Sequence, residues 1–110
     1  MSRTPENLAL GQLTATTLTE IYVSPTGTNT TISSLAFTNT TSTDHSIDVY
    51  RNDGSTDYLV KTLTLPGGSG RKSIYYGLQG TTSNSGDSIK IQSNSAQAFN
   101  YELDGSKVTV

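Results

Sequence analysis

The feature that most restricts how this chain can fold is a short unit that recurs along its length. In each unit a run of roughly four to eight residues alternates apolar and polar side chains, and a turn-forming segment follows. Ser24–Gly27, Asn52–Gly54 and Pro66–Gly70 are the clearest turn signals. Turns spaced by roughly 8–12 residues, without any helical period, predict an all-β domain of about eight strands, built as a sandwich or a barrel.

Two of the predicted strands organise the rest of the chain. They are Ile32–Phe37 and Ile47–Arg51, and the polar connection Thr38–Ser46 joins them. We interpret them as two strands of one antiparallel sheet. Within the first strand Ile32 is out of phase with the apolar residues that follow it, and a β-bulge at Ser33-Ser34 would return it to their face.

The alternation of side chains also predicts the core, because residues two apart on a strand share a face. The predicted inward-facing residues are Ile21, Val23, Leu35, Phe37, Ile47, Val49, Ile74, Tyr76, Ile89, Ile91, Phe99 and Tyr101. In the strand Asp57–Leu65 the phase joins Leu59 to Leu63 and Leu65. Lys61 has the same phase, so either its stem is buried and its amine reaches solvent, or the strand is locally irregular.

The residues near the two ends of the chain predict an N-terminal arm and a late turn. Met1–Asn7 is polar and contains Pro5, which predicts a flexible N-terminal arm before a single sandwich domain that spans residues 8–110. The segment lacks the apolar run of a secretory signal, so if the protein reaches an extracellular particle, we expect it to do so by assembly in a cytoplasm and not through a signal of its own. Near the other end, Asp104-Gly105 is interpreted as a turn.

The composition excludes several classes of function. Apolar residues make up 32% of the chain and charged residues only 15%, whereas 19 threonines and 15 serines fill much of the remainder. With a net charge of −2 and scattered basic residues, the chain has no electrostatic footprint for nucleic acid. The chain has no cysteine and no apolar run of membrane-spanning length, so we expect neither thiolate metal sites nor membrane insertion.

Few residues are candidates for chemistry. His45 is the only histidine, and a loop histidine beside Asp44 explains it better than a catalytic triad. Asp53, Ser55 and Asp57 alternate like the ligands of a calcium loop, but the further ligands such a loop needs are missing, so a hairpin turn is the better interpretation. We therefore predict no catalytic residues, no cofactor and no metal.

Tyrosines are the most informative polar-face residues. Tyr22, Tyr50 and Tyr75 lie opposite the apolar faces of their strands, and Tyr58 does so if the phase of its strand is right. Exposed tyrosines on a weakly charged sheet are typical of protein interfaces, although they also serve as cross-strand partners or as platforms for sugar rings. With Arg3 and Pro5 of the arm, these tyrosines are the predicted interface residues.

The order of the motifs resembles a recurrent family of small bacteriophage virion proteins. The resemblance rests on LTEIYVSPTGTNTTISSLAFTNTTSTDHSIDVYR and on the later LTLPGGSGRKSIYYGLQGTTSNSGDSIKIQSNSAQAFNYEL, and it covers the chain from Leu10 to Val110. It implies a jelly-roll-like or immunoglobulin-like sandwich without catalytic residues. It also implies a virion protein that decorates or cements the capsid as a homo-oligomer, a trimer by analogy with other decoration proteins, in contact with capsid or tail proteins. A tail-associated module that binds a receptor or a carbohydrate is the alternative.

Overall fold

The computed structural model describes residues 6–68, 76–79, 86–96 and 98–109. All regular structure in these residues is β-strand, as the sequence predicts, and eight strands are present. They are β1 (Glu6–Gln12), β2 (Thr19–Val23), β3 (Thr28–Asn39), β4 (His45–Asn52), β5 (Asp57–Leu65), β6 (Tyr76–Gln79), β7 (Ser88–Ser93) and β8 (Phe99–Thr109).

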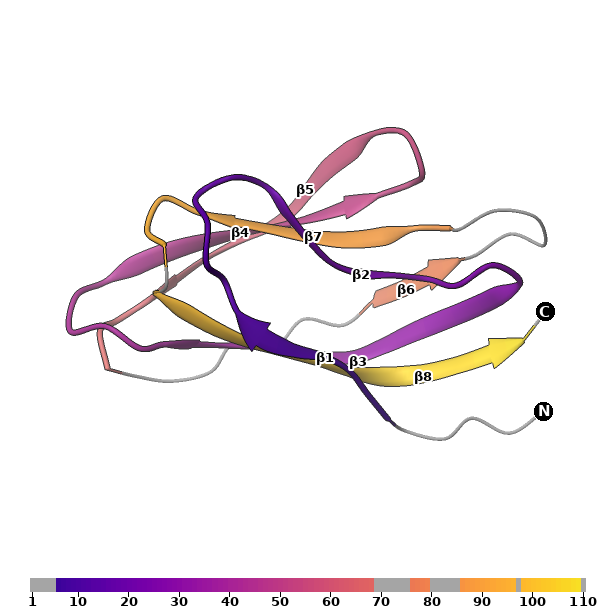
Figure 1. Ribbon diagram of the computed structural model, residues 1–110, viewed down its shortest axis with the longest axis horizontal. Helices are drawn as coiled ribbons and strands as arrows, with labels where there is room; N and C mark the ends of the chain where they lie inside the picture. Colours follow the sequence, from indigo (N-terminus) through magenta and orange to yellow (C-terminus); the bar gives the residue numbers. More distant parts are fainter. Residues whose placement is uncertain (1–5, 69–75, 80–85, 97, 110) are drawn as a thin grey trace.

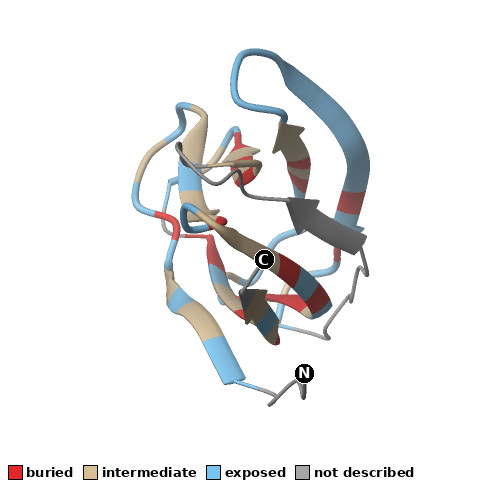
Figure 2. Cartoon of the chain, turned by 90° about the vertical axis from the view of Figure 1, so that its right-hand side faces the viewer, coloured by how far each residue is buried: buried red, intermediate tan, exposed pale blue. Residues whose placement is uncertain are grey.

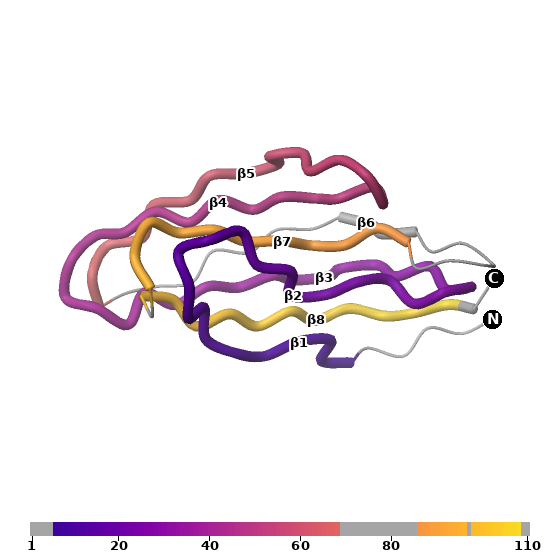
Figure 3. Tube along the Cα trace, turned by 45° about the horizontal axis from the view of Figure 1, so that its top comes forward, coloured from indigo at the N-terminus to yellow at the C-terminus, as the bar shows by residue number. Residues whose placement is uncertain are grey.

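The strands form two antiparallel sheets that lie one above the other (Figures 1 and 3). Sheet A has the order β1-β8-β3-β6, and sheet B has the order β2-β7-β4-β5. Apolar residues fill the space between the sheets, an arrangement compatible with the predicted β-sandwich. The core cluster consists of Leu13, Ile32, Leu35, Phe37, Ile47, Val49, Leu63, Leu65, Ile89, Ile91, Ala98, Phe99 and Leu103.

Most of the predicted inward-facing residues lie in this core. Ile21 and Tyr101 are half-buried and pack against its edge, and Val23 is half-buried. Ile74 and the side chain of Tyr76 lie outside the described residues. The predicted arm ends earlier than expected, because β1 begins at Glu6 and pairs with β8.

The prediction that β3 and β4 belong to one sheet is wrong. β3 pairs with β8 and β6 in sheet A, whereas β4 pairs with β5 and β7 in sheet B. The chain between them crosses from one sheet to the other, around the buried side chain of Asn39. The amide nitrogen of Asn39 donates to the carbonyl oxygens of Thr43 (2.9 Å) and Leu65 (3.0 Å), and its oxygen accepts from the backbone N–H of Thr41 (2.9 Å). A polar connection suits a hairpin and a crossover equally well, so local sequence did not distinguish them.

The predicted bulge in β3 is confirmed, since the pairing of β3 with β8 shifts register between Ile32 and Ser34. The predicted turn at Asp104-Gly105 is wrong, because β8 continues through both residues. A Cβ atom at Gly105 would lie 2.1 Å from the carbonyl oxygen of Thr31. Glycine is needed here because two backbones approach closely, and not because the chain turns.

Candidate interaction surface

The hairpin of β4 and β5 extends past the core, and most of β5 is exposed on both faces. Figure 2 shows this exposed arch at the edge of the molecule. Only Leu63 and Leu65 of β5 are buried; Tyr58, Leu59 and Val60 are 51%, 55% and 44% exposed. We call these three consecutive residues the hairpin patch. It is the longest run of large exposed apolar side chains among the residues that the structure describes.

The predicted phase that joins Leu59 to Leu63 and Leu65 is wrong, and a bulge in β5 explains the error. Val49 pairs with Lys61, but the next residue, Tyr50, pairs with Leu59, so Val60 is an extra residue in the ladder. The bulge reverses the phase of β5 and turns Leu59 to the outer face, beside Tyr50. The local irregularity considered for Lys61 is therefore confirmed. The unusual phase of Lys61 was the signal in the sequence that could have revealed the patch.

Side chains of the turn hold the hairpin in shape. The Asn52 side-chain oxygen accepts from the N–H of Gly54 (2.7 Å), and Gly54 adopts a positive φ of 105° that favours glycine. One carboxylate oxygen of Asp53 accepts from the N–H groups of Ser55 (3.1 Å) and Thr56 (2.9 Å). These bonds confirm the predicted turn at Asn52–Gly54. They also explain why aspartate and asparagine recur here without any need for a cation.

Hydrogen bonds at this turn, together with one ion pair, lower the pKa values of two carboxyl groups. The pKa of Asp53 is lowered, chiefly by the backbone N–H groups of Thr56 and then Ser55, which stabilise the carboxylate. The pKa of Asp57 is also lowered, first by the Asn52 amide (2.7 Å) and then by the Lys90 ammonium (3.1 Å). The turn end of the hairpin is thus tied to β7 by charge.

Acid should weaken the hairpin. Because both carboxyl groups have lower pKa values in the folded chain than in the unfolded chain, their contribution to stability is present above the unfolded values and is lost as the pH falls through the folded ones. The free energy of unfolding should therefore fall as the pH is lowered below about 5. Urea unfolding at a series of pH values would show this. Asp53→Asn keeps the turn acceptor but cannot titrate, so its stability should depend less on pH; equal slopes would contradict the prediction.

The predicted interface tyrosines do not lie together. Tyr58 belongs to the hairpin patch, and Tyr50 is half-buried on the outer face of β4. Tyr22, expected to be exposed, instead packs against the core, and its hydroxyl lies 3.1 Å from the Thr30 hydroxyl. A register shift between Glu20 and Tyr22 turns the ring inward. Tyr75, Arg3 and Pro5 lie outside the described residues.

The histidine and the acidic residues considered as catalytic or metal-binding candidates do not form a catalytic or metal-binding group among the described residues. Nε2 of His45 lies 3.0 Å from the hydroxyl of Thr43, two residues away. Within the described part of the chain, no three His, Cys, Asp or Glu side chains are grouped so that they could hold a metal ion. None of the described residues forms a helix long and apolar enough to cross a membrane.

Comparison with known proteins adds no relative to this picture: no protein-family model matches the chain, and no curated protein matches it at a significant level.

Proposed function

We propose that this chain is a non-enzymatic structural protein of a bacteriophage virion, which decorates or cements the capsid through repeated symmetric contacts. The observation that carries the proposal is the hairpin patch. Its three side chains, Tyr58, Leu59 and Val60, are exposed to solvent on the hairpin of β4 and β5. Exposed apolar side chains of this kind favour association, because each fully buried side chain gains about 1.5–3 kcal/mol from leaving water.

The order of the strands supports a jelly roll over an immunoglobulin-like fold. Among the eight strands that the structure describes, six of the seven successive pairs lie in different sheets, and β4 and β5 are the one pair joined as a hairpin within a sheet. The orders β1-β8-β3-β6 and β2-β7-β4-β5 are those expected when a long antiparallel hairpin is rolled up into two facing sheets. Jelly rolls of eight strands are common in viral capsid proteins and in lectins, so this topology agrees with the proposed role by analogy.

A second copy of the chain is the partner that we propose for the patch. Leu59 lies on the outer face beside Tyr50, whereas Lys61 pairs with Val49 on the opposite face of the hairpin. Two hairpins packed antiparallel about Leu59 would bury the Leu59 side chain of each copy against the other copy, a self-complementary contact of the kind that a two-fold axis requires. Lys61 and the bulge at Val60 disfavour backbone pairing of the edge strand β5 with a strand of another copy. Side chains would therefore make the contact.

The oligomeric state of the purified chain tests this contact. Light scattering after gel filtration, over a range of concentrations, should show self-association that Leu59→Ser weakens. Leu10→Ser is the matched control, since Leu10 is 70% exposed on β1 of the other sheet and should not matter. A dimer fits the two-fold contact, whereas the trimer that the resemblance implies would require a head-to-tail contact.

The role in a virion needs its own test. In particles of a phage that encodes the chain, Leu59→Ser should reduce the number of copies that remain on the particle after washing, because weak sites depend on avidity. Leu10→Ser should leave that number unchanged. Full occupancy by the Leu59→Ser protein would rule out the hairpin patch as the contact, and absence of the chain from purified particles would rule out the proposed role.

A further inference from the structure

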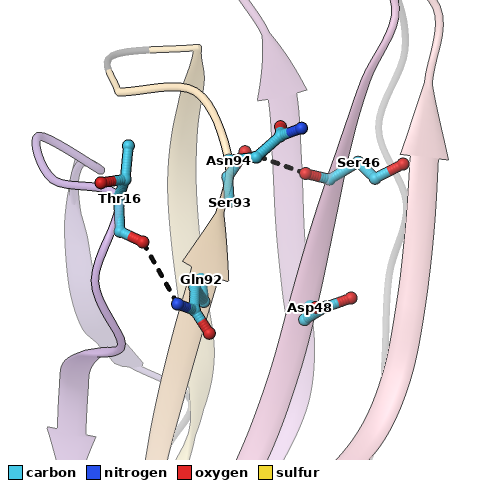
Figure 4. Close-up of a pocket in the computed structure, with 6 residues that line it drawn as sticks. All are labelled: Thr16, Ser46, Asp48, Gln92, Ser93 and Asn94. Atoms are coloured by element: carbon cyan, nitrogen blue, oxygen red, sulfur yellow. Dashed lines mark hydrogen bonds between the residues drawn. The ribbon is translucent and has the colours of Figure 1, made fainter.

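A polar hollow lies on the outer face of sheet B, at the end of β7 (Figure 4). It has a volume of about 350 Å³, within the usual range for small-ligand sites. Its lining comes from the loop after β1, from β4 and from the end of β7. The lining residues are Thr16, Ser46, Asp48, Gln92, Ser93 and Asn94.

The register of sheet B places complementary polar groups side by side in this hollow. Asp48 lies directly across from Gln92 on β7 and from Thr62 on β5. One Asp48 oxygen accepts from the Thr62 hydroxyl (2.8 Å), and the Gln92 amide nitrogen donates to the carbonyl oxygen of Thr16 (3.2 Å). The second carboxylate oxygen and the Gln92 carbonyl oxygen are directed by these bonds and can still accept hydrogen bonds from a ligand.

The backbone around these groups is fixed, so a ligand would find them already in place. Ser93 donates its hydroxyl to the carbonyl oxygen of Ser46 (2.9 Å), which ties the end of β7 to β4. The Ser46 hydroxyl lies 2.9 Å from the Thr64 hydroxyl on β5. Preorganised polar groups lose little conformational entropy on binding.

An aromatic residue, Tyr50, lies along the strand from this polar row, outside the lining of the hollow. Tyr50 follows Asp48 by two residues on β4, so both side chains are on the outer face of the sheet. Tyr50 in turn lies across from Lys90 and Leu59 in the neighbouring row. A tyrosine offers an apolar ring face together with a polar hydroxyl.

We propose that the hollow binds a neutral saccharide, whose ring hydroxyls donate to Asp48 and Gln92 while an apolar ring face packs on Tyr50. Sugar hydroxyls both donate and accept, which matches a lining of hydroxyls, amides and one carboxylate. An anion would be repelled by Asp48, the one charged group of the lining. An apolar ligand would leave the lining without hydrogen bonds, at a cost in free energy. Calcium requires six to eight oxygen ligands, which one carboxylate serves poorly.

Tyr50 lies opposite Leu59 on the same outer face, so the test also uses the Leu59→Ser protein, in which self-association is weakened. The purified chain would be applied to an array of neutral, sialylated and sulfated glycans. The free sugar of the best neutral ligand would then be titrated to saturation by ¹⁵N NMR, with calcium chloride alone in parallel. We expect shifts at Asp48, Gln92 and Tyr50, in the Leu59→Ser protein as well as in the wild type.

Substitutions decide whether the hollow is the site. Asp48→Ala and Gln92→Ala should each weaken binding about tenfold or more, because each removes a hydrogen bond from the sugar. Asp48→Asn keeps one oxygen acceptor and should lose less, and Glu6→Gln on sheet A is the matched control without effect. Thermal melting would check that each variant is folded. The inference is overturned if no neutral saccharide binds, if folded Asp48→Ala binds as tightly as the wild type, if anionic glycans are preferred, or if calcium alone occupies the hollow.

Discussion

Replacing Phe37 by alanine should lower the free energy of unfolding by roughly 3–5 kcal/mol. The side chain is fully buried between the sheets, and its ring meets the edge of Phe99, with centroids 6.4 Å apart and planes at 78°. Its removal takes away both the transfer energy of the ring and the aromatic contact, and the close-packed neighbours can only partly fill the space. Domains of this size have a total stability of about 5–15 kcal/mol, so the loss is a large share of the total and should be easy to measure.

Urea unfolding followed by circular dichroism would measure this loss. Leu10→Ala is the appropriate control, because Leu10 is also a large apolar residue in a strand of sheet A but is 70% exposed; its effect should stay within about 0.5 kcal/mol. Phe99→Ala and the double variant would give the energy of the ring pair, expected at about 0.5–1.5 kcal/mol. A loss below about 1 kcal/mol for Phe37→Ala would mean that the ring is not in the core.

The second large effect should come from Asn39, where the chain crosses from sheet A to sheet B. Asn39→Ala should cost roughly 2–4 kcal/mol, because the carbonyl oxygens of Thr43 and Leu65 lose their donor and the N–H of Thr41 loses its acceptor. Each buried polar group left without a partner costs about 1–3 kcal/mol. The crossover also depends on Gly67, whose absent Cβ would lie 2.3 Å from the backbone of Ser42.

A charged variant separates the hydrogen bonds of Asn39 from its packing. Asn39→Asp has nearly the same shape, but it points an oxygen at the carbonyl groups of Thr43 and Leu65. Its loss of stability should therefore be at least as large as that of Asn39→Ala at neutral pH, and smaller in acid, where the acid is protonated and can donate. Asn100→Ala, at an exposed position of β8, is the control. If Asn39→Ala were as harmless as the control, the crossover would be held by other contacts.

The local features of this protein follow from its sequence because they depend on neighbouring residues. A turn forms where Ser24–Gly27 predicts one, but it is one residue later: the N–H of Thr28 donates to the carbonyl oxygen of Pro25 (3.1 Å), and Gly27 has a φ of 70°. The bulge after Ile32 was predictable because it alone reconciles that residue with the face of Phe37. Alternation over a few residues likewise identified most of the core.

Other features depend on contacts between residues that are distant in the chain, and only the tertiary structure shows them. Whether β3 and β4 share a sheet is set by their pairing with β8 and β7, which a polar connection between them does not encode. The same holds for Gly105, which looks like a turn residue until Thr31 is placed against it. The hairpin patch arose from a bulge that shifted Leu59 outward, and the hollow from a register that set Asp48 beside Gln92. Each of these surfaces is a product of strand pairing, and strand pairing follows from the free energy of the whole core and not of one segment.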